Sequence, residues 1–328
     1  MISQSIRGCI APTFTIFGSD LSFDPDGQRR FLDFLVDRGG ISAFFVRSGM
    51  GQMYTFSFDD VKAMASTACG HLKGRARVLV GASGIWDRDR ENYPDPAVYT
   101  NQAVELSKYA EEQGADGVVH TVPEAILPRD GQTAADVVLT YFETVSAAVG
   151  IPTFIYQPPE TSASHQVTHE LISRLADMPN VAGIKVSTAD AGYIASLCAA
   201  VYGKDFDYIT GNENAFCAGL YAGSKAVIGQ GAAMYPQILN TLQEQFEAGD
   251  APGAVYTQHV VYKLVAFPIN SVEFFKRYAT ENGYEVEAYA RPMNGAAYRK
   301  TIGTVSEEQY AAYKRLLEAE LAPYLSTL

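Results

Sequence analysis

Short apolar runs alternate along the chain with longer segments whose apolar residues recur three or four positions apart. The runs are rich in valine, isoleucine and phenylalanine and are typical of buried strands, whereas the spaced segments predict amphipathic helices. Steady alternation of the two predicts a parallel sheet, and about eight such units favour a (β/α)8 barrel, an α/β fold of the TIM type, over an open sheet. The predicted strands cover residues 8–14, 41–46, 76–81, 116–123, 151–156, 181–187, 206–210 and 226–231.

The last part of the chain continues the helical pattern without further strands. We therefore expect residues 1–236 to form the barrel and residues 237–328 to form a C-terminal helical extension packed on it, as a single domain overall. No Gly-x-Gly-x-x-Gly motif follows the first predicted strand, which weakens a dinucleotide-binding sheet as the alternative. The predicted helices of the extension are 238–246, 254–267, 271–280 and 306–325.

Composition and charge argue against some classes of binding partner. At 47% hydrophobic and 19% charged residues, the chain is typical of a soluble globular protein. Its net charge of -12 and pI of about 4.9 argue against a nucleic-acid or anionic-membrane partner, because phosphate binding needs a basic surface. No apolar run approaches the ~20 residues of a membrane span. The first residues lack the apolar core of a signal peptide, so we expect a cytoplasmic protein.

The cysteines and histidines do not predict a metal site. His165 and His169 are four positions apart, but they stand at a predicted helix start and are expected on a solvated face. The cysteines never form a Cys-x-x-Cys pair and are best interpreted as buried free thiols: Cys9, Cys69, Cys198 and Cys217.

Lys185 interrupts the apolar run 181–187, where a lysine is costly. An ammonium that loses water without gaining a partner is unfavourable, so burial favours the neutral amine. A neutral amine is a nucleophile towards carbonyl carbon. The alternative is that Lys185 stands at the exposed end of the strand and only solubilises it.

Active sites of (β/α)8 barrels form where strands end and the following loops begin. Tyr156 ends the strand one βα unit before Lys185, so the two residues are expected on neighbouring strands. A phenol beside an amine can transfer protons during imine formation, although Tyr156 alone is more typical of an aromatic at a strand end. The other unusual residues at predicted strand ends are Ser48, Gly49, Met50, Glu124, Ser187, Glu213, Asn214 and Gln230.

Two motifs carry a family resemblance: residues 151–159 (IPTFIYQPP) and 183–185 (GIK), supported by 114–117, 219–223 and 290–292. Over about residues 8–325 the chain resembles the dihydrodipicolinate synthase / N-acetylneuraminate lyase superfamily, the pyruvate-type class I aldolases and dehydratases. The resemblance implies that Lys185 forms a Schiff base with the keto carbon of a 2-oxo acid and that Tyr156 moves protons. The protonated imine is itself an electron sink, so no metal or organic cofactor is expected.

The resemblance also implies substrate-binding residues. The family's Gly-Thr-Thr-Gly-Glu loop corresponds to residues 48–52 (SGMGQ), and the N–H groups of Ser48, Gly49 and Met50 are expected to bind the substrate carboxylate as an anion-binding nest. The alternative is a plain turn. Residues 211–214 (GNEN) resemble the segment with which the sugar-acid branch binds substrate hydroxyls, although Glu213 and Asn214 could instead cap the next helix. The candidate hydroxyl-binding residues are Ser187, Gly211, Glu213, Asn214 and Gln230.

Several positions depart from the family pattern. Gly49 stands where the proton relay has a hydroxyl residue, and Glu124 and Ala125 replace the relay's second tyrosine. Glu124 either replaces that tyrosine as an acid or base or is an exposed loop carboxylate, which we slightly favour. Thr161 replaces the synthase's arginine, which argues against aspartate semialdehyde as the substrate. Residues 84–96 (GIWDRDRENYPDP) match no family pattern and would form a lid, a subunit contact or, most commonly, a solvated surface loop.

The sequence therefore predicts a Schiff-base lyase that acts on a small-molecule 2-oxo acid. Aldol cleavage of a 2-keto-3-deoxy sugar acid to pyruvate and an aldehyde is the favoured reaction. A dehydratase or deaminase would use the same imine, and a non-catalytic paralogue that binds a 2-oxo acid is the alternative of another class. The resemblance further implies a homo-oligomer, a tetramer, with no nucleic-acid or membrane partner.

Overall fold

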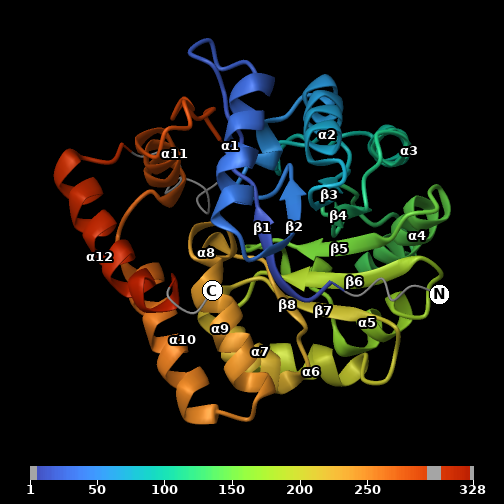
Figure 1. Cartoon of the computed structure of the whole chain (residues 1–328). Coiled ribbons are helices and arrows are strands. Elements are labelled where there is room, and N and C mark those ends of the chain that lie inside the picture. The colour runs from blue at the N-terminus through green and yellow to red at the C-terminus, as the bar shows by residue number, and fades with distance from the viewer. Residues whose placement is uncertain (1–5, 294–303, 326–328) are drawn as a thin grey trace.

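Parallel strands close into a barrel in the order in which they follow one another along the chain (Figure 1). The computed structural model describes residues 6–293 and 304–325, and within them eight strands pair each with the next and the last with the first. The predicted (β/α)8 barrel is therefore confirmed. The strands are β1 (Gly8–Pro12), β2 (Ile41–Val46), β3 (Arg77–Gly81), β4 (Gly117–Thr121), β5 (Thr153–Gln157), β6 (Val181–Val186), β7 (Asp207–Thr210) and β8 (Ala226–Val227).

Helices surround the barrel, and capping side chains explain where several of them begin. Ser57 and Asp60 form a reciprocal capping box at the start of α2, and Thr133 and Asp136 form another at α4. Each of the first seven helices follows the strand of the same number: α1 (Pro25–Arg38), α2 (Phe58–Leu72), α3 (Pro96–Glu112), α4 (Ala134–Ala147), α5 (His169–Leu175), α6 (Ala191–Ala200) and α7 (Phe216–Ala222).

The eighth unit differs from the prediction. The strand predicted at residues 226–231 ends at Val227, and the short helix α8 (Gln230–Met234) begins at Gln230. At the start of α8 the N–H of Gly231 donates to Glu213 Oε1 at 3.0 Å. Gly229 is required beside it, since a Cβ there would lie 1.8 Å from Glu213 Oε2.

The C-terminal helices contact the outside of the barrel and one another. Helix α9 (Pro236–Glu247) contacts β1 and α7, and α10 (Ala251–Ala266) contacts α9. Helix α12 (Glu307–Leu325) contacts both α9 and α10, whereas α11 (Ser271–Glu281) contacts α1. These helices form the orange and red side of the molecule in Figure 1.

The core has separate layers inside and outside the barrel wall. Because successive strand residues face opposite sides of a sheet, Ile155 joins the layer between strands and helices while Tyr156 joins the cluster inside the barrel. That inner cluster includes Ile10, Phe45, Leu79, Val119, Phe154 and Ile209. Strand alternation thus directs Tyr156 into the barrel at the end where the strands finish.

Phe275 of α11 provides a test of how firmly the extension is attached. Its buried ring lies 5.7 Å from Phe14, 6.1 Å from Phe31 and 5.2 Å from Phe34, measured between ring centroids. We expect Phe275→Ala to lower the free energy of unfolding by about 3–5 kcal/mol, because it leaves a cavity among these rings. Chemical denaturation measures this change.

Tyr202→Ala is the matched control, since that side chain is 92% exposed. Its effect should stay within about 0.5 kcal/mol. Similar free-energy changes in the two variants would contradict the packing of α11 against the barrel.

Candidate active site

Lys185 and Tyr156 lie side by side at the ends of neighbouring strands. Their Cα atoms are register partners between β5 and β6, which confirms the predicted placement. Lys185 is 7% exposed and Tyr156 is 2% exposed, so the interpretation of Lys185 as a solubilising surface residue is wrong. Lys185 Nζ lies 4.0 Å from the centroid of the Tyr156 ring. A cationic amine is attracted to the ring face, and the ring shields the amine from water.

Glu213 brings a buried carboxylate towards this pair. It begins the short 3-10 helix η3 (Glu213–Ala215) just after β7 and is 5% exposed. Burial raises the pKa of Glu213, while the N–H of Gly231 and the charge of Lys185 oppose that rise. Burial thus disfavours the ionised carboxyl, and the amine and the backbone donor favour it.

The other candidate hydroxyl-binding residues lie at the ends of β6 and β7 and at the start of α8. The N–H of Ser187 donates to Gln157 O at 3.0 Å, and the N–H of Gly211 donates to Val186 O at 2.9 Å, so both backbones hold the strand ends together. Asn214 Oδ1 is buried and accepts no hydrogen bond from the described residues. Gln230 is half-buried at the first position of α8. A buried amide oxygen without a donor suits a ligand hydroxyl.

The turn after β2 leaves three backbone donors available. Ser48 Oγ donates to Thr13 O and accepts from Gly51 N, both at 3.1 Å, so this side chain stabilises the turn. Among the described residues, the N–H groups of Ser48, Gly49 and Met50 find no backbone or side-chain acceptor. Successive unpaired amides of this kind can bind a carboxylate.

Arg291, in the segment after α11, stabilises this turn through Gln52. Gln52 Nε2 donates to Arg291 O at 2.7 Å, and the N–H of Arg291 donates back to Gln52 Oε1 at 3.2 Å. The Arg291 guanidinium pairs with Asp60 at 2.7 Å. These contacts hold Gln52 in the left-handed conformation, with a φ of 61°, that the turn requires.

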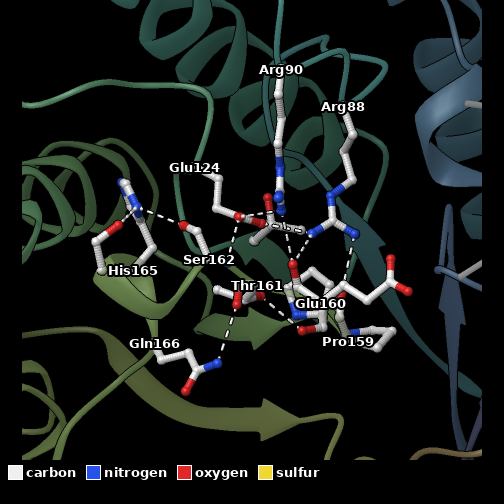
Figure 2. Close-up of polar contacts among 12 residues, drawn as sticks. Arg88, Arg90, Glu124, Pro159, Glu160, Thr161, Ser162, His165 and Gln166 are labelled. Carbon is white, nitrogen blue, oxygen red and sulfur yellow. Dashed lines mark hydrogen bonds and ion pairs between the residues drawn. The ribbon is translucent and has the colours of Figure 1, made fainter. Parts of the chain in front are cut away.

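Figure 2 shows that the Glu124 carboxylate binds two arginines of the loop after β3. Arg88 Nη2 lies 2.8 Å from Glu124 Oε2, Arg90 Nη2 lies 3.3 Å from Oε1, and the N–H of Ser162 donates to Oε1 at 2.8 Å. The Glu124 side chain is 6% exposed and that of Arg88 is 9% exposed. The interpretation of Glu124 as an exposed carboxylate is therefore wrong. The loop 84–96 is partly solvated, as expected for a surface loop, but Arg88 packs it against Glu124.

The same loop reaches the turn that follows Tyr156. Arg88 donates to Pro159 O at 3.2 Å, and Arg90 donates to Glu160 O at 2.9 Å (Figure 2). Loops after β3, β4 and β5 are thus joined by one set of charged hydrogen bonds. Because each buried charge has an opposite partner, the cluster can exist with little water.

Tyr54 also belongs to this region and is a residue that the sequence analysis missed. It lies in the 3-10 helix η1 (Met53–Thr55), is half-buried, and packs against the inner cluster that contains Tyr156. Arg88 Cζ lies 5.2 Å from the centroid of its ring. Burial raises the pKa of Tyr54, and the charge of Arg88 opposes that rise. Its position shortly after the Ser48 turn was the only available signal in the sequence.

The cysteines and His165 are buried and are not among the candidate site residues. All four cysteines are buried and unpaired, as predicted. His165 lies in the 3-10 helix η2 (Ala163–His165), 4% exposed, so its predicted position on a solvated face is wrong. Within residues 6–293 and 304–325, no group of three histidine, cysteine or acidic side chains could hold a metal ion. No helix in that part of the chain is long and apolar enough to cross a membrane.

Comparison with known sequences gives relatives of several activities. YagE of Escherichia coli K12, which carries the provisional name of a 2-dehydro-3-deoxy-D-gluconate aldolase, is 29% identical over 260 residues, covering 78% of this chain and 80% of YagE. A 4-hydroxy-tetrahydrodipicolinate synthase of Rhodopseudomonas palustris is 26% identical over 256 residues, covering 78% of this chain and 79% of the synthase.

Solved structures share the fold. A crystal structure of YagE in complex with pyruvate superposes with a TM-score of 0.75 at 24% identity, covering 96% of this chain and 98% of YagE. The sialic acid aldolase of Ruminococcus gnavus gives a TM-score of 0.79 at 20% identity, covering 97% of this chain and 99% of the aldolase. The model of the dihydrodipicolinate synthetase family matches residues 5–320. With nearly its whole length matched, this chain belongs to the dihydrodipicolinate synthetase family.

Proposed function

We propose that this protein is a Schiff-base lyase that acts on a 2-oxo acid, with Lys185 as the nucleophile and Tyr156 as the proton-transferring residue. The packing of the buried Lys185 amine on the Tyr156 ring, 4.0 Å from its centroid, is the observation that carries this proposal. Membership of a family whose named relatives are aldolases and synthases supports it.

In this mechanism Lys185 Nζ attacks the keto carbon, and loss of water gives a protonated imine. The imine draws electrons from the adjacent carbon–carbon or carbon–oxygen bond, so the barrier to cleavage falls. The turn amides of Ser48, Gly49 and Met50 would bind the carboxylate next to the imine. These three donors fix the acid end of the substrate, which directs its remaining carbons towards the barrel opening.

The favoured substrate is a 2-keto-3-deoxy sugar acid, which aldol cleavage would convert to pyruvate and an aldehyde. The buried carboxyl of Glu213 and the Oδ1 of Asn214, which accepts no hydrogen bond from the described residues, are acceptors for substrate hydroxyl groups. Ser187, Gly211 and Gln230 are the further candidates for hydroxyl binding. A site with buried acceptors strongly prefers substrates that satisfy them. The name of YagE and its pyruvate complex agree with this choice. Release of water rather than pyruvate would instead identify a dehydratase.

Borohydride trapping tests the shared covalent step. With pyruvate present, we expect reduction to attach the three-carbon acid irreversibly to Lys185 and to abolish activity, because the imine carbon accepts hydride. Mass spectrometry of proteolytic peptides locates the adduct. Lys185→Arg should prevent the adduct, since a guanidinium does not form the imine.

Lys276 is the internal control for this experiment. It is 1% exposed, and burial lowers its pKa to about 7, so a substantial neutral fraction exists near neutral pH. Its amine donates to Tyr289 O at 2.7 Å and lies outside the inner barrel cluster. An adduct on Lys276 in place of Lys185, or no adduct at all, would contradict the proposed function.

Glu213→Gln tests how much the ionised, buried carboxylate destabilises the folded state. The raised pKa of Glu213 means that ionisation is harder in the folded than in the unfolded state, so the parent loses stability as pH rises through the folded-state pKa. We expect Glu213→Gln to be more stable than the parent near neutral pH, with the difference shrinking as pH approaches the unfolded value of about 4.3. Denaturant titrations across this pH range measure the difference.

The exposed Glu112 supplies the control for this titration. Glu112→Gln should leave the pH dependence of stability close to that of the parent. A stability difference for Glu213→Gln that does not vary with pH would argue against a carboxyl that is hard to ionise.

A further inference from the structure

Imine formation at Lys185 takes up one proton, because a neutral amine and a ketone give a protonated imine and one water molecule. If the Tyr156 hydroxyl donates this proton to the departing hydroxide, Tyr156 becomes a phenolate. It stays a phenolate until hydrolysis of the imine returns the proton or a second group donates one. Proton exchange with solvent while the imine persists therefore needs a second donor near Tyr156.

Among the described residues, the turn after β2 and the neighbouring Gln157 offer no free side-chain hydroxyl to donate this proton. Ser48 Oγ is committed to Thr13 O and Gly51 N. Position 49 is glycine and position 50 is methionine, so the turn after β2 offers no other hydroxyl there. Gln157 faces away, because its Oε1 accepts from Val167 N and Tyr193 Oη. Tyr54 remains as the phenol whose ring packs on the inner cluster with Tyr156.

Tyr54 is more exposed to solvent than the buried Lys185–Tyr156 pair. It is half-buried, whereas Tyr156 is 2% exposed, so Tyr54 can exchange a proton with water at the barrel opening. Tyr156 is also close enough to contribute to the raised pKa of Tyr54, after burial as the main cause. A phenol in this position can pass a proton inward and regain one from solvent.

Arg88, held by Glu124, lies against the Tyr54 ring and favours ionisation of its hydroxyl. The Arg88 guanidinium lies 5.2 Å from the ring centroid of Tyr54, and Glu124 holds that guanidinium at 2.8 Å. A nearby cation stabilises the phenolate that forms when Tyr54 releases its proton. Arg88 is itself immobilised by Pro159 O and Glu160 O (Figure 2), so this stabilisation requires no rearrangement.

We propose that Tyr54 is the residue that reprotonates Tyr156 during the lysine chemistry, and that the Arg88–Glu124 ion pair positions it. The inference rests on the proposed Schiff-base function. The proton passes from the Tyr54 hydroxyl to the Tyr156 phenolate, and Tyr54 regains a proton from water. The loop 84–96 thus contributes to catalysis through Arg88, which is a positioning residue.

Exchange of the methyl protons of pyruvate with deuterated water tests this proposal without a known substrate. The exchange needs an imine and repeated proton transfer, and NMR follows it directly. We expect Tyr54→Phe to slow the exchange by about 10²-fold, the typical contribution of a positioned acid or base, with little change in the pyruvate concentration at half-saturation. Prolonged borohydride trapping should still label Lys185 in this variant, because removing the hydroxyl slows the step without removing the amine.

Tyr99→Phe is the matched control. Tyr99 is 3% exposed and lies in the outer core layer, so loss of its hydroxyl should leave the exchange rate within a few-fold of the parent.

Arg88→Gln is a second test variant, and it keeps the Tyr54 hydroxyl. Without the guanidinium, ionisation of Tyr54 is harder, so the pH dependence of the exchange rate should move to higher pH. A residue with only a structural role would not shift this profile.

The outcomes separate the inference from the function on which it rests. A parent protein that neither traps nor exchanges pyruvate overturns both. A parent that exchanges pyruvate, together with a Tyr54→Phe variant of equal rate, overturns the role of Tyr54 alone. An Arg88→Gln variant with an unshifted pH profile overturns the role of the ion pair, whether or not Tyr54→Phe folds.

Discussion

The contact between the Lys185 amine and the Tyr156 ring depends on closure of the barrel. Strand register places the two Cα atoms opposite each other, and strand alternation directs the Tyr156 side chain inward. Phe45 of β2 meets the Tyr156 ring edge-on at 6.1 Å and limits its movement. An open sheet would leave both groups exposed to water. The closed barrel therefore provides the buried environment that the proposed imine chemistry at Lys185 needs.

Charge pairing determines how the loops around this contact are arranged. Glu124 is buried at the end of β4, and an unpaired carboxylate there would be strongly destabilising. Arg88 and Arg90 compensate it, and the N–H of Ser162 adds a donor from the following loop. Satisfying one carboxylate thus joins the loops after β3, β4 and β5. An extended surface loop becomes part of the barrel opening for this reason.

The residues that could be predicted from the sequence are those whose positions follow from local pattern. Lys185 lies within an apolar run, and Tyr156 lies one βα unit earlier, so strand adjacency placed them together. Glu124, Arg88 and Tyr54 were not predicted as a group, because their contacts join three loops whose conformations no periodicity encodes. The start of α8 was missed for a similar reason, since an N–H group there donates to Glu213, which is distant in sequence.

The two buried carboxylates beside the lysine–tyrosine pair differ in how their charge is compensated. Following the strand order, Glu124 comes after β4 and Glu213 after β7, so they flank the pair on β5 and β6. Glu124 has two guanidinium partners, whereas Glu213 has a backbone donor and the charge of Lys185. On the proposed chemistry, the protonated imine places positive charge at Lys185 until bond cleavage converts it to a neutral enamine. That charge favours an ionised Glu213, and the ionised Glu213 in turn stabilises the imine cation on which cleavage depends.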